Sequence, residues 1–209
     1  MNLKNLILIN LMLIWIIPTA NTLEWTKVYK KKDKILYRRM HPDYMKFEYK
    51  LEQKIKLSAK KFFNAVMDFS HYQKILPNIL ESRVVKKENN TLFVYLLLDF
   101  TILKNREYIL EINNFENQNN KTYLINWTAN NEIPINTNKK NVRLSLVKGQ
   151  WNIKGIDENN CLITYSLIND WKLNFPAKMI STFEQKTILK NPEQMLAWAR
   201  KKHISVVDL

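Results

Sequence analysis

The residues best suited to acid–base chemistry lie in one short stretch, VMDFSHYQKILPNILESRVV, at positions 66–85. Asp68 precedes His71 by three residues, and a carboxylate so placed could orient an imidazole as a general base. Such a base needs a nucleophile, and no Ser or Cys stands in a nucleophile-elbow context. The spacing also crosses the junction of two expected helical segments. Helix capping by Asp68 beside an exposed His71 is therefore favoured over catalysis.

The other residue types that could bind a metal or attack a substrate are few and scattered. His41 and His203 are isolated, so the sequence predicts no metal site. The single cysteine, Cys161, lies in the alternating stretch CLITYSLI and is interpreted as a small buried apolar residue. Two glycines, Gly149 and Gly155, are too few for a Gly-rich phosphate loop or a dinucleotide fingerprint. We expect neither a cofactor nor a metal.

Arg106 and two tryptophans are candidates for ligand contact. Arg106 follows a mostly apolar stretch, where it could bind a headgroup carboxylate or phosphate bidentately or form a salt bridge with Glu107 or Asp99. Trp127 and Trp151 lie on expected central strands, so they could line a cavity or fill a packed core. Both environments are apolar and inward-facing, and both interpretations stay open.

The elements that position these residues begin with strands. WTKVY and ILYRR, joined by a Lys-rich turn, predict a hairpin over 25–39, and YMKFEYKLEQKIKL predicts a long strand over 44–57. The apolar period then changes to that of a helix, with Ser58 as the expected N-cap. A second short helical segment over 68–76 is predicted to end before Pro77.

The second half of the chain is predicted to be mostly β, followed by one long helix. LFVYLLL at 92–98 is apolar on both faces, which is typical of a strand buried between two layers. Apolar residues at helical spacing predict an amphipathic C-terminal helix, which we expect to kink or restart near Asn191-Pro192. The candidate strands are 80–88, 91–98, 106–116, 121–129, 141–154 and 161–171.

Length and composition are those of one globular domain. The chain has 209 residues, of which 46% are hydrophobic and 25% charged, enough to bury one substantial core. The expected order is a hairpin and a long strand, two short helices, antiparallel strands and a long helix. This order predicts an α+β fold in which one curved antiparallel sheet wraps around the C-terminal helix, a helix-grip architecture.

The N-terminal segment is predicted to be a separate unit. Lys4 precedes the apolar stretch 6–17, and Pro18 with small residues ends it, as in a secretory signal peptide; an uncleaved membrane anchor is the alternative. We therefore divide the chain into a signal peptide at 1–22 and a domain at 23–209, and expect a periplasmic or secreted protein. Loss of Lys4 lowers the net charge from +14 to +13, which favours anionic surfaces, while export argues against nucleic acid.

Several stretches together resemble the START-like, polyketide cyclase/dehydrase-like (SRPBCC) group of bacterial lipid-binding domains, over residues 24–203. The helix segment resembles that group in carrying Asp68, Tyr72, Pro77 and Ser82. Four later segments are also similar, namely LKNREYIL (103–110), VKGQWNI (147–153), ITYSLIND (163–170) and FPAKMI (175–180). Two departures lie beside the expected cavity entrance: Trp171 follows Asp170 in place of a Pro-Gly turn, and the terminal helix is longer.

The resemblance implies a helix-grip fold with two short helices after the second or third strand and a ligand cavity between the sheet and the C-terminal helix. It implies that Asp68 caps or braces the helix junction and that Arg106 braces the sheet, which favours the salt bridge over headgroup binding. The expected cavity residues are Tyr95, Leu97, Arg106, Trp127, Trp151, Met179, Ile180 and Phe183.

On this basis we expect a monomer that binds a lipid or other apolar small molecule without catalysis. Transfer of that molecule is an extension of the same expectation. Transient contact with an anionic membrane surface is expected. An enzyme of the cyclase/dehydrase or hydrolase kind, with Asp68, His71 or Arg106 as its polar groups, is the first alternative. A protein-interaction module that uses the basic face is the second.

Overall fold

The computed structural model of the chain describes residues 24–100, 103–134 and 140–207, with side chains up to Lys201. The predicted signal peptide at 1–22 lies outside these residues. In chain order the elements are β1 (Thr26–Lys31), β2 (Lys34–His41), β3 (Lys46–Ile55), α1 (Ala59–Val66), η1 (Phe69–His71), α2 (Tyr72–Ile75), β4 (Ile79–Glu88), β5 (Thr91–Leu98), β6 (Arg106–Asn117), β7 (Thr122–Asn130), β8 (Val142–Arg143), β9 (Val147–Gly155), β10 (Cys161–Asn169) and α3 (Ala177–Val207).

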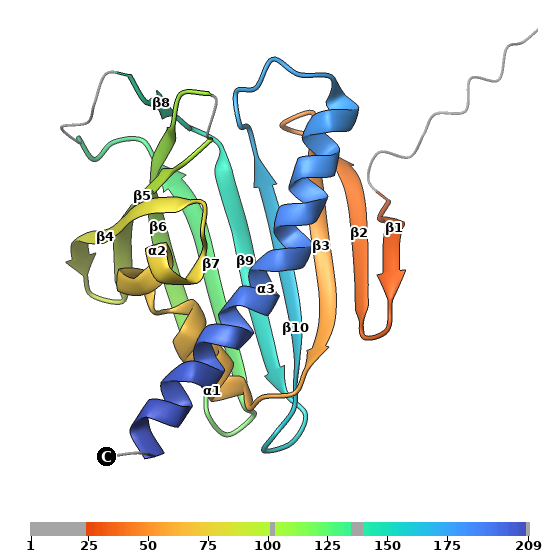
Figure 1. Cartoon of the computed structure of the whole chain (residues 1–209), viewed down its shortest axis with the longest axis vertical. Coiled ribbons are helices and arrows are strands. Elements are labelled where there is room, and N and C mark those ends of the chain that lie inside the picture. The colour runs from red at the N-terminus through yellow and green to blue at the C-terminus, as the bar shows by residue number, and fades with distance from the viewer. Residues whose placement is uncertain (1–23, 101–102, 135–139, 208–209) are drawn as a thin grey trace, which may run out of the picture.

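The strands of the described residues form one sheet in the order β1-β2-β3-β10-β9-β7-β6-β5-β4, with β8 beside β6. Neighbours in this order are antiparallel, whereas β8 runs parallel to β6. Two strands that are far apart in the sequence, β3 and β10, pair in the middle of the sheet, with Ile55 opposite Cys161. Figure 1 shows α3 across one face of the sheet, with its C-terminal end beside α1. The predicted α+β, helix-grip architecture is confirmed.

The main core lies between that face of the sheet and the helices. Every second residue of β3, from Tyr49 through Leu51 to Ile55, contributes to the core, apart from the buried polar Gln53. The short helix α1 packs onto the same core with one face, which includes the fully buried Phe62. Because the strands alternate and the helices present one apolar side, the side chains of the sheet and of the helices meet in one core.

β5 is buried on both faces, as LFVYLLL predicted. Val94 and Leu96 belong to the main core beneath the helices. Phe93 and Tyr95 alternate to the opposite face, where they form a second cluster with Ile109 of β6. This part of the sheet is therefore covered by apolar side chains on its outer side as well.

The two short helical segments form where they were predicted, but without side-chain capping hydrogen bonds. Ser58 occupies the N-cap of α1 with extended backbone, yet its hydroxyl makes no capping hydrogen bond. Asp68 occupies the N-cap of η1 and makes no capping bond either. Ser58 is therefore the N-cap residue that was predicted, but neither side chain forms a capping hydrogen bond. The second segment consists of the 3-10 turn η1 followed by α2. It ends at Leu76, whose extended backbone suits a residue that precedes a proline.

The expected strand over 141–154 is interrupted. It consists of the two-residue β8 and the longer β9, with Leu144 between them. The Leu144 N–H donates to the Glu107 carbonyl oxygen at 2.9 Å, and its side chain is fully buried. The chain therefore leaves β6 only after Leu144 has entered the core, and β9 begins beside a different strand, β7.

α3 continues through Pro192 as one helix, so the expected restart is not found. Ile188 and Met195 flank the proline and are 1% and 2% exposed. Their packing outweighs the cost of a proline inside a helix, about 3 kcal/mol. In the described part of the chain, neither α3 nor any other helix combines the length and the apolar character needed to cross a membrane.

Candidate functional site

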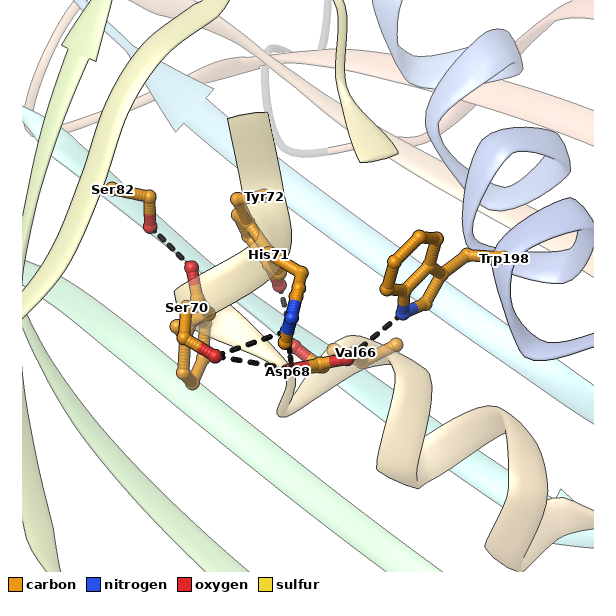
Figure 2. Close-up of polar contacts among 8 residues, drawn as sticks. Val66, Asp68, Ser70, His71, Tyr72, Ser82 and Trp198 are labelled. Carbon is orange, nitrogen blue, oxygen red and sulfur yellow. Dashed lines mark hydrogen bonds and ion pairs between the residues drawn. The ribbon is translucent and has the colours of Figure 1, made fainter. Parts of the chain in front are cut away.

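The junction of α1, η1 and α2 carries the polar group that the sequence offered for catalysis (Figure 2). His71 Nδ1 lies 2.7 Å from Asp68 Oδ1 and 3.1 Å from the Ser70 hydroxyl oxygen. The Ser70 hydroxyl also donates to Asp68 Oδ1 at 3.3 Å. In a Ser-His-Asp relay the serine and the carboxylate contact opposite nitrogens of the imidazole. Here both contact Nδ1, so these residues form a closed local cluster and not a proton relay.

Asp68 uses its other carboxylate oxygen to hold the C-terminal helix. Trp198 Nε1 on α3 donates to Asp68 Oδ2 at 2.8 Å, as Figure 2 shows. The indole ring also lies 5.3 Å from the ring of His71. Asp68 thus braces the junction, by joining it to α3 and not by capping a helix.

Two further hydrogen bonds hold the same junction to the sheet and to itself. The Tyr72 hydroxyl donates to the Val66 carbonyl oxygen at 2.5 Å, which joins α2 to the end of α1. The Ser82 hydroxyl on β4 donates to the Phe69 carbonyl oxygen at 2.5 Å. The polar residues of the stretch 66–85 therefore fix how the short helices sit on the sheet.

An apolar cavity of about 100 Å³ lies next to this junction, between the sheet and the helices. The sheet contributes the inner faces of β4 to β7, β9 and β10, and the short helices close one side. α3 contributes Thr187 and Asn191, and Trp171 comes from the connection that leads into α3. Because its wall unites residues from both ends of the fold, the cavity exists only in the assembled domain.

Trp127 and Trp151, two of the predicted site residues, line this cavity. Trp151 stacks on Tyr165 with ring centroids 3.9 Å apart and planes 6° apart, and Trp127 lies 6.0 Å from the same ring. Gly149 makes room for this arrangement. A Cβ atom at Gly149 would lie 2.4 Å from the Trp127 ring and 2.3 Å from the Ser166 carbonyl oxygen, both too close.

Tyr95 and Leu97 lie on the opposite face of the sheet, so their assignment to the cavity is wrong. The residues of β5 that line it are Leu96 and Leu98. Tyr95 belongs to the second apolar cluster, and its hydroxyl donates to Glu107 Oε2 at 3.1 Å. Both faces of this strand are apolar, so the pattern did not indicate which alternate residues face the helices.

Arg106 is buried beside the cavity but is not part of its wall. Its guanidinium donates to the carbonyl oxygens of Lys104, Trp171 (3.2 Å) and Lys172 (3.3 Å). It also lies over the Phe100 ring, 4.6 Å from the centroid. Burial lowers the pKa of this guanidinium. Arg106 therefore ties β6 to the connection before α3.

The favoured salt bridge of Arg106 with Glu107 or Asp99 is not found. Among the residues that the structure describes, no ion pair joins Arg106 to either carboxylate. Glu107 points to the outer face, where it accepts from Tyr95 and, at 2.8 Å, from Asn141 Nδ2. The arginine braces the sheet as expected, but through carbonyl oxygens.

The three residues of α3 that were predicted to face the ligand do not line the cavity. Met179 is 56% exposed, and Ile180 packs at the margin of the core. Phe183 contacts the ring of Trp171 at 5.6 Å, one layer behind the wall that Trp171 forms. The predicted residues lie too close to the start of the helix, whose first turn is exposed, whereas the α3 residues that line the cavity lie further along it.

The polar residues of the cavity were not predicted as site residues. They include Tyr72, Tyr108 and Tyr165, together with Asn191, whose Nδ2 donates to the Tyr165 hydroxyl at 3.3 Å. Burial raises the pKa of Tyr165 to about 12 and also raises the pKa of Tyr72 and of Tyr108, so all three phenols are protonated near neutral pH. Alternation in β6 and β10 places Tyr108 and Tyr165 inward, but only the fold brings them together.

A second polar cluster lies under the N-terminal half of α3. The Ser181 hydroxyl lies 2.9 Å from the Tyr49 hydroxyl and 3.1 Å from Arg38 Nη1. The neighbouring Glu184 is 6% exposed, and burial raises the pKa of its carboxyl to about 7. Tyr49 and Trp171 partly oppose this shift by hydrogen bonding to the ionised form. The helix is thus held to β2 and β3 by polar contacts around a carboxyl that titrates near neutral pH.

Among the residues that the structure describes, a metal site and a reactive thiol are the remaining kinds of chemistry to consider. In the described ranges no group of three or more His, Cys, Asp or Glu side chains could bind a metal ion. Cys161 is fully buried at the start of β10, and burial raises the pKa of its thiol to about 12. A thiol so placed carries almost no thiolate near neutral pH.

The family described as polyketide cyclase / dehydrase and lipid transport matches residues 55–196 of this chain. This range runs from the end of β3 into α3 and contains every residue that lines the cavity. Among curated proteins, no significant match to the sequence was found.

Solved structures share the fold at low sequence identity. Human STARD10 is 18% identical with a TM-score of 0.74, over 85% of this chain and 73% of that chain. A STAR-related lipid transfer protein from Xanthomonas axonopodis (fragment 25–204) is 18% identical with a TM-score of 0.67, over 85% and 97%. The Zhui aromatase/cyclase from Streptomyces sp. R1128 is 11% identical with a TM-score of 0.54, over 74% and 94%. From the match and this shared fold, we conclude that the chain belongs to the polyketide cyclase / dehydrase and lipid transport family and is a START-like domain with the helix-grip fold.

Proposed function

We propose that this protein binds a lipid or another apolar small molecule in the cavity between the sheet and α3, without catalysis. The observation that carries the proposal is the composition of the cavity wall, which is aliphatic and aromatic apart from a few hydroxyl and amide groups. Moving apolar ligand surface from water into such a wall is favourable by about 25 cal/mol per Å². The cavity is therefore suited to a ligand that water solvates poorly.

The comparisons support binding at the level of the family. The family description names lipid transport, and the Xanthomonas neighbour is a STAR-related lipid transfer protein. The Streptomyces neighbour is an aromatase/cyclase, so the same fold also serves catalysis elsewhere. Against catalysis here, the phenols in the wall are protonated near neutral pH and poor general bases there, and the Asp68–His71 cluster lies outside the wall.

The size of the cavity implies that part of its wall moves when a lipid enters. A volume of about 100 Å³ is well below the roughly 300–1,000 Å³ of pockets that enclose drug-sized ligands. The N-terminal half of α3 lies over the sheet through polar contacts to β2 and β3. We place the opening there, because hydrogen bonds to water can replace such contacts at little cost.

Native mass spectrometry of the purified protein, followed by lipid extraction, tests binding directly. We expect a co-purified apolar ligand that Val147→Phe, which fills the cavity, reduces or abolishes. Val84→Phe is the matched control, because Val147 is 3% exposed in the cavity wall whereas Val84 is 47% exposed on β4. Equal ligand content in both variants, or no ligand in the wild type even after incubation with lipid vesicles, would contradict the proposal.

Cross-linking tests the opening. A short bismaleimide between Arg38→Cys and Ser181→Cys, whose native side chains are in contact, should slow lipid exchange with vesicles. The same reagent between Lys56→Cys and Arg200→Cys tethers the C-terminal half and should leave exchange unchanged. Each double variant before cross-linking is its own reference, and the native Cys161 is buried and unreactive. Exchange that is equally fast with and without the first tether would exclude this half of α3 as the gate.

A further inference from the structure

If the cavity holds an apolar ligand, as proposed above, its few polar atoms decide which class of ligand it accepts. Among the described residues, no Lys, Arg, His, Asp or Glu side chain lines the wall. Arg106, the nearest buried cation considered above, is bound to three carbonyl oxygens. A charged group brought into this cavity would lose its hydration without gaining an opposite charge, which is strongly unfavourable.

Three phenols converge in this uncharged cavity, one from α2, one from β6 and one from β10. All three line the same cavity, and burial followed by the neighbouring Tyr165 raises the pKa of both Tyr72 and Tyr108. The Tyr72 hydroxyl is already used, because it donates to the Val66 carbonyl oxygen. The Tyr165 hydroxyl accepts from Asn191, which leaves its own hydrogen to be donated.

Tyr108 and Tyr165 therefore retain hydrogen-bond donors inside the cavity. Within the described ranges, neither hydroxyl has a protein acceptor, although the two side chains are 7% and 4% exposed. Neither hydroxyl is fully enclosed by protein atoms, because among the described residues only Gln53 Oε1 is a fully buried side-chain atom without a partner. Both donors therefore open onto the cavity. A bound molecule with an oxygen atom can accept a hydrogen bond from these hydroxyls, whereas a hydrocarbon cannot.

We propose that the cavity selects an uncharged, mostly apolar ligand with one acceptor oxygen, a ketone, ester or hydroxyl, bound by the hydroxyls of Tyr108 and Tyr165. Asn191 positions the Tyr165 hydroxyl by donating to it from α3, so the hydrogen of Tyr165 is directed to the ligand. Carboxylates and phosphates are disfavoured at this site because no cation lines it. The polar end of the ligand thus lies inside the domain, near the middle of α3.

Three probes of equal chain length separate the effects of the hydrocarbon chain, an acceptor oxygen and a negative charge on affinity: octane, octan-2-one and octanoate. The affinity of each is measured by equilibrium dialysis above pH 7. We expect octan-2-one to bind more tightly than octane, and more tightly than octanoate by at least about tenfold. This comparison uses the wild-type protein and does not depend on the folding of a variant. Octanoate binding as tightly as octan-2-one would overturn the selection of uncharged ligands.

Tyr108→Phe tests the assigned hydroxyl, because it removes the donor and keeps the ring. It should weaken octan-2-one binding about three- to tenfold and leave octane binding unchanged. Tyr123→Phe is the matched control: Tyr123 is also buried on the inner face, stacked on Phe63, but does not line the cavity. Equal weakening of octane and octan-2-one by Tyr108→Phe, or no weakening of either, would overturn the assignment.

The outcomes also separate this inference from the proposed function. If none of the three probes binds, both are overturned. If octane and octan-2-one bind equally well and Tyr108→Phe changes neither, the cavity still binds apolar molecules, and only the role of the phenols is overturned.

Discussion

The two halves of α3 are attached to the rest of the molecule in different ways. The C-terminal half is anchored by apolar side chains, among them Met195 and Ala199, and by the Trp198–Asp68 hydrogen bond. The N-terminal half begins with the exposed Met179 and lies over a polar cluster that includes Glu184, and its fully buried apolar residue, Ile188, lies close to the middle of the helix. Apolar packing is lost only by separating the surfaces, whereas polar contacts can be exchanged for water. One helix thus combines an apolar anchor at its C-terminal end with a polar cluster under its first turns, the end that we propose detaches.

The largest expected effect comes from truncating the same residue type in the two halves. Met195→Ala should lower the free energy of unfolding by about 2–5 kcal/mol, because Met195 is 2% exposed and its removal leaves a void. Met179→Ala should change it by less than about 0.5 kcal/mol, because Met179 is largely in water. Urea unfolding measures both, and equal losses would show that the two halves are anchored alike.

The second prediction uses pH to weaken only the N-terminal half. The pKa of Glu184 is raised from 4.5 to about 7, so the folded state binds this proton more tightly than the unfolded state. The resulting stabilisation is fully present below about pH 4.5 and is lost as the pH rises through about 7; its upper limit is about 3 kcal/mol. Arg38 of β2 and Lys46 of β3 also act on this carboxyl and lower its pKa, which keeps the shift from being larger.

Glu184→Gln should remove this part of the pH dependence and make the protein more stable than the wild type above about pH 7. Glu193→Gln is the matched control, because Glu193 lies on the same helix but its side chain is 58% exposed and pairs with Lys34. Urea unfolding at pH values on both sides of 7 provides the measurement. If the free energy of unfolding of Glu184→Gln depended on pH as it does in the wild type, the titrating group would be a residue other than Glu184.

The third prediction weakens the C-terminal end of α3. Trp198→Phe removes the indole N–H that donates to Asp68 Oδ2. Loss of this hydrogen bond should lower the free energy of unfolding by about 1–3 kcal/mol. Trp25→Phe should cost less, because Trp25 lies at the first strand and contacts Arg39 through its ring face, 4.4 Å from the guanidinium carbon. Thermal unfolding distinguishes them, and equal shifts in Tm would mean that the Asp68 bond contributes little.

The smallest expected effect concerns membrane contact. If the detachable end faces an anionic bilayer, Lys178→Gln should weaken binding to anionic vesicles by about 1 kcal/mol, and added salt should reduce the difference. Lys201→Gln, an exposed lysine at the C-terminal end, should have little effect. Vesicle co-sedimentation measures both variants. A stronger effect at Lys201 would place the opposite end of α3 at the membrane.

The strands and helices were predictable because their apolar periods are local properties of the chain. The hairpin at 25–39, the strand at 44–57 and the change to helical period after Ser58 all appear in the structure at nearly the expected places. Local preference failed at Pro192, where tertiary packing on both sides of the proline maintains the helix. It also failed at 144–146, where the strand breaks because Leu144 enters the core.

The cavity was harder to predict than the fold. Trp127 and Trp151 could be placed because their strands alternate clearly, whereas Tyr95 and Leu97 were assigned to the wrong face of a strand that is apolar on both. The hydroxyl of Tyr165 gains its role only from Asn191, which belongs to a different element. Such pairs depend on how a helix lies across a sheet, and no periodicity within either element carries that information.

The position of β10 has a consequence for the order in which the chain can fold. The strands from β4 to β7 and then β9 are neighbours nearly in sequence order, so they can pair as they leave the ribosome. β3 can complete its pairing only after β10 has been synthesised, because Ile55 pairs with Cys161. Pairing between segments so distant in sequence is slow. Until Asn169 has been synthesised, β3 keeps an open edge beside the apolar Tyr49 and Leu51, a feature that invites aggregation. The sheet is therefore completed only when β10, the last strand to be synthesised, pairs with β3.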